Sequence, residues 1–386
     1  MSQNRLIIAA AGSGKTSTII NEIMDKPSER ALITTFTLAN ESSIRQKLIE
    51  KNKGSIPQNV TVQTWFSFLI EHGVRPYRYW GKRVDGLKFV TNKSETGIKP
   101  FFITVGGKKI RPEWGEDENF DAHYFTSNMN IYSDKLSKLV VRCNNPPKDR
   151  GEKGLVIRRL SEIFDSIYID EVQDMAGYDL EVIKLLLKSN IRITMVGDPR
   201  QTVYLTHHAT KFSKYKEGKI KEFIESLNTK RKTLCSVDEE TLKDSHRNSS
   251  QICELSSKLY PEFSRCESQL RKLHKHIGIY FIRESDAIAY GDEFSPLQLK
   301  LDKSISLFLP TQNMNFGESK GLEANHVLIY PTKGMLDWLK DNTVELAFKT
   351  RAQLYVALTR AFFSVGVVVP DNFDKGVCNI DIWSPS

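Results

Sequence analysis

The stretch Ala9-Ala10-Ala11-Gly12-Ser13-Gly14-Lys15-Thr16 decides the fold, because it joins two apolar patterns of different period. The run Leu6-Ile7-Ile8 precedes it. Apolar residues at helical spacing follow it: Ile19, Ile20, Ile23 and Met24. The order is therefore strand, glycine-containing loop and helix. In such a loop the backbone N–H groups converge with the positive end of the helix dipole, and this favours phosphate oxygens.

The loop predicts a nucleotide-phosphate site formed by Ala11, Gly12, Ser13, Gly14, Lys15 and Thr16. Lys15 would reach the terminal phosphates, and the Thr16 hydroxyl would hold Mg²⁺. The usual pattern begins with glycine where this chain has Ala9. A small-residue turn between strand and helix is the alternative, but it gives no reason for lysine followed by threonine at the start of a helix.

Length and composition limit the class of protein. The chain has 386 residues, enough for about two or three domains. A hydrophobic content of 40% with 26% charged residues is typical of a globular protein. No apolar run is long enough to suggest a membrane-spanning segment, so we expect no membrane partner. The strand at Leu6 leaves no room for a cleavable leader, so we expect a cytoplasmic protein. The five cysteines are scattered, which argues against a disulfide framework and a zinc site.

The charge balance indicates a polyanionic partner. Lysine and arginine outnumber aspartate and glutamate by 55 to 47, and the formal net charge is +8. Basic residues concentrate between residues 75 and 111, where aromatic residues are interleaved with them. Basic groups can follow a phosphate backbone while aromatic faces stack on bases. A solvated basic face over a small aromatic core is the alternative interpretation.

The remaining pattern predicts an α/β fold. Strand-like apolar runs recur at 31–36, 60–65, 167–169 and 191–196, with helical patterns between several of them. Strands that are apolar on both faces and alternate with helices favour a parallel sheet covered on each side. A second alternation starts near residue 236, with a helix around Ile252 to Leu259 and strands at 277–282, 305–309, 327–330 and 365–369.

These patterns divide the chain into three expected parts. Residues 1–71 and 156–235 form a first lobe, residues 72–155 form a subdomain inserted in it, and residues 236–386 form a second lobe.

Carboxylates follow one of the apolar strands, in Ile167-Tyr168-Ile169-Asp170-Glu171-Val172-Gln173-Asp174. The carboxyl end of a parallel strand beside a phosphate loop is where ligands bind in such sheets. We therefore expect Asp170 to share Mg²⁺ with Thr16, and Glu171 to orient and deprotonate an attacking water. Alone, polar residues after a strand are more often a solvated turn.

Five motifs in order resemble those of the UvrD/Rep-like superfamily 1A DNA helicases. They are the phosphate loop, Asp170 to Asp174, Val196-Gly197-Asp198-Pro199-Arg200-Gln201-Thr202-Val203-Tyr204, Lys320-Gly321-Leu322-Glu323, and Leu354-Tyr355-Val356-Ala357-Leu358-Thr359-Arg360-Ala361. The resemblance covers nearly all of the chain except 72–155. It implies two RecA-like (P-loop NTPase) lobes with ATP and Mg²⁺ bound between them.

The resemblance also implies roles for individual residues at the ATP site. Gln173 and Gln201 would sense the γ-phosphate from the first lobe, and Arg247 and Arg360 would reach it from the second. Glu323, beside Gly321, would meet the ribose, and His246 would stack on the adenine. Arginines supplied by a separate lobe make hydrolysis depend on closure of the two lobes.

The resemblance implies a binding track for single-stranded DNA, or for the single-stranded tail of a duplex. Its expected contacts are Phe36, Thr37, Thr64, Trp65 and Tyr204. Stacking of a base on an aromatic ring does not depend on base identity, which suits a motor that accepts any sequence. A buried aromatic is the alternative for both Phe36 and Trp65.

Two functions follow as hypotheses. The first is an ATP-dependent single-stranded-DNA translocase or helicase, with 3′-5′ movement implied by the resemblance. The second is a DNA-binding ATPase subunit that regulates a partner nuclease, as in Gabija-like antiphage systems. The regulatory insertion found in the second lobe of many relatives has little space here, which motivates the second hypothesis. A replication or repair protein is another expected partner, and the sequence does not separate these settings.

Overall fold

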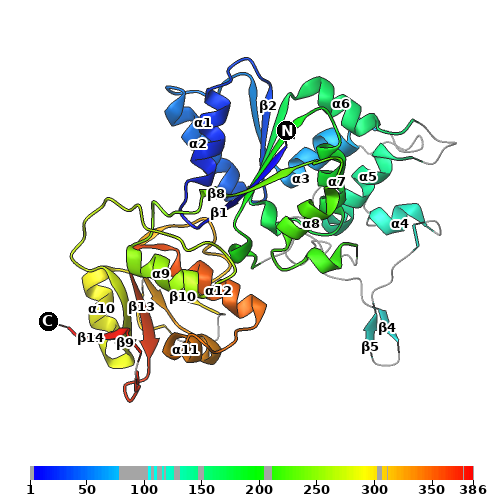
Figure 1. Cartoon of the computed structure of the whole chain (residues 1–386). Helices are drawn as coiled ribbons and strands as arrows, with labels where there is room; N and C mark the ends of the chain where they lie inside the picture. Colours follow the sequence, from blue (N-terminus) through cyan, green and yellow to red (C-terminus); the bar gives the residue numbers. More distant parts are fainter. Residues whose placement is uncertain are drawn as a thin grey trace.

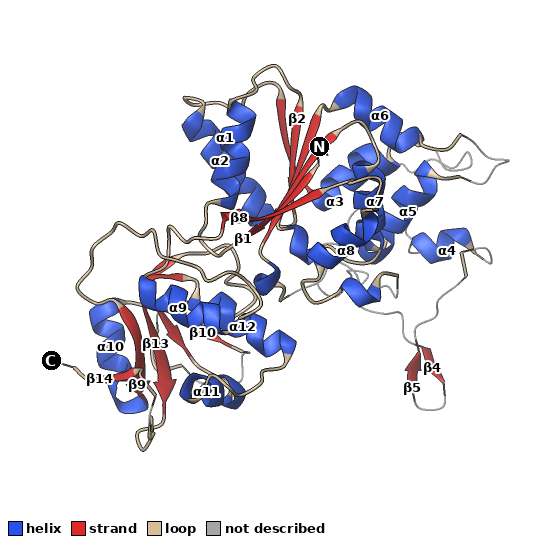
Figure 2. Ribbon diagram, in the orientation of Figure 1, coloured by secondary structure: helices blue, strands red, loops and turns tan. Residues whose placement is uncertain are grey.

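The computed structural model describes residues 4–77, 103–105, 108–110, 115–116, 119–125, 131–146, 152–203, 211–301, 307–310, 312–376 and 378–385. The described chain forms two lobes, each built on a six-stranded parallel sheet (Figure 1). Helices cover both faces of each sheet (Figure 2). The predicted α/β class with two RecA-like lobes is confirmed. No helix within the described ranges is long and apolar enough to cross a bilayer.

The first sheet has the strand order β3-β2-β6-β7-β1-β8. Its strands are β1 (Arg5–Ala9), β2 (Ala31–Thr35), β3 (Val60–Thr64), β6 (Ser166–Asp170), β7 (Arg192–Gly197) and β8 (Ser236–Leu242). All of these neighbours pair in parallel, so the carboxyl ends of β1, β6 and β7 meet at one edge. That edge holds the phosphate loop, which follows β1, and the carboxylates that follow β6.

Successive residues of each central strand are buried against helices on opposite faces. Ile7 packs with α1 (Lys15–Met24) and α2 (Leu38–Lys51). Leu6 and Ile8 pack on the other face. The helices there are α3 (Trp65–Phe68), α5 (Leu136–Asn144), α6 (Leu155–Ile163), α7 (Tyr178–Leu187) and α8 (Ile220–Leu227). This is why the strands read as continuous apolar runs.

The second sheet has the order β11-β10-β12-β13-β9-β14. Its strands are β9 (Gly278–Arg283), β10 (Leu297–Lys300), β11 (Asn313–Asn315), β12 (Ala324–Ile329), β13 (Ala361–Val369) and β14 (Asp381–Trp383). One face carries α9 (Ser250–Lys258), α11 (Lys333–Lys340) and α12 (Phe348–Leu358), and the other carries α10 (Ala287–Phe294). The sheet places α12 and the residues that follow it toward the first lobe.

The structure changes the expected boundaries in two places. Residues 236–242 form β8 and pair with β1, so the first lobe continues through Leu242. Part of the expected insertion belongs to the core of the first lobe, because Leu136, Leu139 and Val140 of α5 pack in the same cluster as Phe68. The remainder includes α4 (Phe120–Tyr124) and the hairpin of β4 (Ile103–Val105) and β5 (Lys108–Ile110).

Two expectations fall wholly or partly outside the described residues. Most of the basic and aromatic stretch between 75 and 111 lies outside them, so its binding role stays a prediction. The expected strand at 305–309 lies partly outside them, and residues 307–309 carry no strand.

Two histidines of the second lobe are enclosed by other side chains, His276 half-buried and His326 buried. His276 stacks on Phe294 with ring centroids 4.0 Å apart, and its Nε2 lies 3.2 Å from the Tyr290 hydroxyl. His326 is 6% exposed, and its Nδ1 lies 2.7 Å from Ser364 Oγ. Burial lowers the pKa of both imidazoles to about 4, and the neighbouring His274 adds to the effect.

Neutral histidines held in the fold make its stability depend on pH. In the unfolded chain the two histidines have an ordinary pKa of about 6.5. As the pH falls, they therefore bind protons in the unfolded chain at a higher pH than in the folded chain. Their stabilisation is present above that pH and is lost as the pH falls toward the folded value. We expect the contribution of these two histidines to the free energy of unfolding to fall between about pH 6.5 and pH 4.

Urea unfolding followed by circular dichroism at several pH values tests this expectation. His326→Gln should flatten the pH profile relative to the parent, whereas His246→Gln, which alters an exposed histidine, should leave its slope unchanged. Parallel profiles for the parent and His326→Gln would contradict it.

Candidate active site between the lobes

The phosphate loop has the backbone that its glycines allow. Gly12 and Gly14 adopt φ values of 71° and 86°, in the left-handed region that favours glycine. Gly14 is the N-cap of α1, so the first helical N–H groups face the loop. Ser13 is 4% exposed, and its hydroxyl has no hydrogen-bond partner among the described residues. A buried hydroxyl beside a helix N-terminus fits a phosphate oxygen as its partner.

Thr16 and Asp170 meet across the edge of the first sheet. Thr16 Oγ1 donates to Asp170 Oδ2 over 3.3 Å. Burial raises the pKa of Asp170 to about 6, and the neighbouring Glu171 carboxylate adds to the rise. A hydroxyl and a carboxylate are oxygen ligands of the kind that Mg²⁺ takes alongside nucleotide phosphates. The donor set therefore fits the expected cation.

Glu171 is held in a strained conformation beside two cations. Its φ is 58°, a left-handed value that costs a non-glycine residue on the order of 1 kcal/mol or more. Burial alone would raise its pKa, but the ammonium groups of Lys15 and Lys320 outweigh burial and hold it at about 2. Lys15 Nζ lies 3.9 Å from Glu171 Oε1. The carboxylate therefore stays ionised and can orient a water.

Gln173 connects this carboxylate to the next strand. Its side-chain N–H donates to Glu171, and its Oε1 accepts from the Asp198 backbone N–H over 3.1 Å. Gly197 makes this possible, because a Cβ there would lie 2.3 Å from Gln173 Oε1. Only glycine fits at that end of β7.

The two predicted arginines of the second lobe differ in their partners: Arg360 contacts the first lobe, whereas the Arg247 guanidinium pairs with groups of its own lobe. Arg360 is 1% exposed, and its Nη2 donates to Gln201 Oε1 over 3.3 Å. Burial and the nearby Arg247 lower its pKa to about 9, which still leaves it charged at neutral pH. Arg247 Nε donates to Glu323 Oε1 over 3.0 Å, and its Nη1 donates to the Thr359 carbonyl over 3.3 Å.

The second lobe lies directly against the phosphate loop. The His246 backbone N–H donates to the Gly12 carbonyl over 3.0 Å, while the His246 side chain is exposed. A Cβ on Gly12 would lie 2.5 Å from Arg247 Cβ. Gly321, with φ of 89°, approaches Asn40 at the start of α2. The expected halves of the site are therefore in contact.

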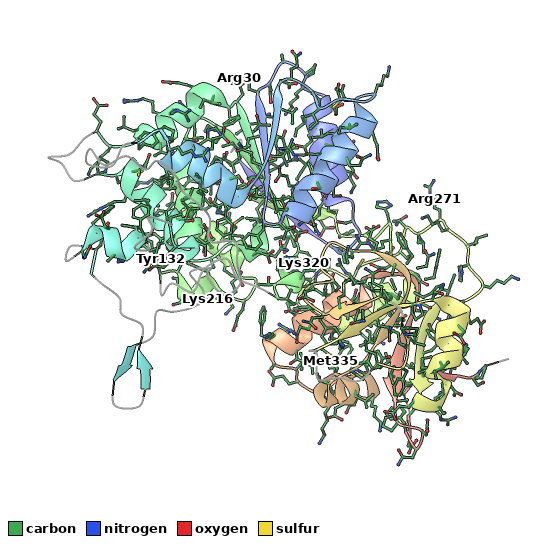
Figure 3. All side chains as sticks on the ribbon, turned by 180° about the vertical axis from the view of Figure 1, so that it is seen from behind. Arg30, Tyr132, Lys216, Arg271, Lys320 and Met335 are labelled. Atoms are coloured by element: carbon green, nitrogen blue, oxygen red, sulfur yellow. The ribbon has the colours of Figure 1, made fainter. Side chains whose placement is uncertain are left out.

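Lys320 is a site residue that sequence reasoning left without a role. It lies at the junction of the lobes (Figure 3). Its Nζ donates to the two oxygens of Asp174 over 2.6 and 2.8 Å and lies 3.3 Å from Glu171 Oε2. The two carboxylates outweigh burial and raise its pKa. The position of Lys320 in the motif that ends at Glu323 indicates that it belongs to the site. The sequence does not show which carboxylates Lys320 contacts.

The expected DNA contacts separate into three groups. Phe36 is half-buried with its ring centroid 5.5 Å from that of Phe66, and Thr37 is exposed where it caps α2. Thr64 is buried and caps α3. Trp65 is fully buried, and its Nε1 donates to Asp179 over 2.8 Å. This corrects the expectation for Trp65, because a ring enclosed in the core presents no face to a base. Tyr204 lies outside the described residues.

Comparison with known proteins supports the expected resemblance. Residues 86–217 match the UvrD/REP helicase N-terminal domain. The chain is also similar to the Gabija protein GajB of Bacillus cereus (strain VD045), with 26% identity over 246 residues. That match covers 55% of this chain and 42% of GajB, so the chain spans less than half of its relative's length. Part of the chain therefore resembles a UvrD/REP helicase N-terminal domain, and part of it is distantly similar to GajB.

The chain also aligns with solved helicase structures at TM-scores below 0.5. An arterivirus nonstructural protein 10 helicase aligns with a TM-score of 0.46 and 13% identity, over 97% of this chain and 62% of that one. The PRRSV helicase aligns with a TM-score of 0.44 and 14% identity, over 96% and 53%.

Removing the Lys320 charge should destabilise the protein. Lys320→Met keeps most of the side-chain length but leaves buried Asp174 without its cation and partly buried Glu171 with Lys15 alone, so we expect a loss of about 3 kcal/mol in the free energy of unfolding. Lys258→Met breaks an exposed pair with Glu254 and should cost less than about 1 kcal/mol. Urea unfolding at neutral pH measures both. Equal losses in the two variants would contradict a buried ion-pair role for Lys320.

Proposed function

We propose that this protein is an ATP-dependent motor on single-stranded DNA, a translocase or helicase moving 3′-5′. The observation that carries the proposal is the contact between Arg360 and Gln201, which joins a cation of the second lobe to a polar group beside the first lobe's carboxylates. A site completed by a second lobe makes hydrolysis depend on closure, and closure is the motion that a motor needs.

The residues present can be assigned to the parts of a phosphoryl-transfer site. The loop from Ala11 to Thr16 would bind the phosphates, with Lys15 on the terminal ones. Thr16 and Asp170 would hold Mg²⁺, which when bound neutralises charge on the phosphates. Glu171 would accept a hydrogen bond from the attacking water and orient it.

The second lobe would supply the remaining charge. Arg247 and Arg360 would stabilise negative charge that develops on the transferred group, as preorganised cations do in a site closed to water. Gln173 and Gln201 lie within hydrogen-bond range of Glu171 and Arg360 and would register the γ-phosphate. Gly321 and Glu323 are assigned to the ribose side, and His246 to the base.

DNA binding rests on charge and on the resemblance. The net charge of +8 favours a polyanion, and exposed Thr37 beside half-buried Phe36 leaves one aromatic of the expected track near the lobe junction. Gly321 of the second lobe approaches the same helix start through Asn40. A DNA strand bound across this junction would contact both lobes and would be displaced when the lobes move relative to each other.

ATP hydrolysis measured with and without single-stranded DNA tests the motor. We expect DNA to stimulate turnover, Lys15→Ala to abolish it, and Glu171→Gln to bind ATP while hydrolysing it at least about a hundredfold more slowly. Lys188→Ala, which alters an exposed lysine after α7, should leave turnover unchanged. An equal rate of ATP hydrolysis with and without single-stranded DNA would contradict the motor function.

The similarity to GajB favours a second candidate function. In this alternative the chain is a DNA-binding ATPase subunit that regulates a partner nuclease, as in Gabija-like antiphage defence, with little unwinding of its own. Duplexes with a 3′ or a 5′ single-stranded tail separate the two candidates. Strand separation by the isolated protein on the 3′-tailed substrate supports the motor, and DNA-stimulated hydrolysis without unwinding supports the regulatory subunit.

A further inference from the structure

A buried carboxylate lies behind the two groups that join the lobes. Asp198 is 0% exposed and follows β7. Its Oδ1 accepts from the Arg200 backbone N–H over 3.2 Å and from Arg200 Nε over 2.7 Å. Its Oδ2 accepts from Gln201 Nε2 over 3.1 Å and from the Tyr355 hydroxyl over 3.0 Å. Of these donors, only Tyr355 belongs to the second lobe.

Tyr355 reaches the phosphate loop with the same oxygen. The Ala11 backbone N–H donates to the Tyr355 hydroxyl over 3.4 Å. The hydroxyl therefore bridges the loop after β1 and the carboxylate after β7, while its own residue lies in α12. Burial raises the pKa of Tyr355 well above its ordinary value, so the hydroxyl keeps its proton and remains a donor to Asp198.

Packing fixes the ring of Tyr355 across the lobe boundary. The Arg200 guanidinium carbon lies 5.3 Å from the centroid of the Tyr355 ring and 5.2 Å from that of Phe263. Arg200 Nη2 also donates to the Ala9 carbonyl over 2.9 Å. Tyr260 packs edge-on against Tyr355 with ring centroids 5.5 Å apart. Separation of the two lobes would expose the face of the Tyr355 ring that packs on Arg200, and it would break both hydrogen bonds of the Tyr355 hydroxyl.

Asp198 in turn orients Gln201. Because Oδ2 accepts from the amide N–H of Gln201, the other end of that amide, Oε1, is directed to Arg360 Nη2. A change at Tyr355 thus reaches Gln201 through one shared carboxylate oxygen. The same change reaches the phosphate loop directly through Ala11.

We propose that Tyr355 is a positioning residue whose hydroxyl links closure of the second lobe to the alignment of Gln201 and of the phosphate loop. The catalytic part of this proposal rests on the proposed ATP hydrolysis. Tyr355 is assigned no direct role on the nucleotide. It acts by fixing Asp198, and through Asp198 the Gln201–Arg360 contact, only when the lobes are closed.

Tyr355→Phe is the informative variant, because it removes the hydroxyl and keeps the ring against Arg200 and Tyr260. Loss of a hydrogen bond to a buried carboxylate corresponds to about a tenfold change, so we expect kcat for ATP hydrolysis to fall about tenfold with KM for ATP within about twofold. Tyr330→Phe is the matched control. Tyr330 is also buried in the second lobe, and its hydroxyl donates to Gln298 over 2.8 Å, away from the lobe boundary.

A double-mutant cycle with Asp198→Asn tests the route of the effect. If Tyr355 acts through Asp198, adding Tyr355→Phe to Asp198→Asn should lower kcat by less than about twofold. Independent, multiplying effects would overturn the coupling through Asp198.

Hydrogen exchange of the peptide containing Ala11 provides a readout that needs no hydrolysis. We expect faster exchange there in Tyr355→Phe, and exchange unchanged from the parent in Tyr330→Phe. Unchanged exchange in Tyr355→Phe, or equal acceleration in both variants, would overturn the proposal. A parent protein without ATPase activity would overturn the proposed function, and the exchange comparison would still decide the role of Tyr355.

Discussion

Buried Asp170 and Asp174 and partly buried Glu171 lie within one turn at the end of β6, and like charges so close repel strongly where water is scarce. Lys15 from the first lobe and Lys320 from the second offset that repulsion. The site is thus electrostatically complete only when both lobes contribute. Burial raises the pKa of Asp170 and Asp174 to about 6, while the lysines hold that of Glu171 at about 2, so neighbouring carboxyls are prepared for different tasks.

This constraint connects the fold to the proposed mechanism. Parallel strands bring the loop after β1 and the carboxylates after β6 to one edge of the first sheet. The second sheet presents α12 and the turn before β13, which carry Tyr355 and Arg360. In the proposed mechanism, hydrolysis and release of phosphate change the charge of the nucleotide bound between the two lobes. That change alters the electrostatic attraction that holds the lobes together. A change of charge at the junction can therefore become a relative motion of the lobes.

Sequence reasoning predicts the parts of the site that are local. The change of period at Gly12 to Thr16 predicts the loop, and an apolar strand that ends at Asp170 predicts the carboxylates, because both patterns lie within a few residues. Arg247 and Arg360 came from a resemblance and not from periodicity. Contacts between the two lobes could not be predicted from the sequence. Nothing along the chain indicates that Lys320 contacts Asp174 or that Tyr355 and Gln201 both donate to Asp198. Burial of Trp65 was undecided for the same reason, because its partner Asp179 lies far along the chain.

A structure of the protein with Mg²⁺, ADP and a fluoride analogue of the transferred phosphoryl group tests the central claim most directly. If the lobes share one site, both Arg247 and Arg360 will contact the fluoride group while Lys15 and Glu171 contact it from the first lobe. A nucleotide bound by the first lobe alone, with both guanidinium groups directed away from the analogue, would contradict a shared site.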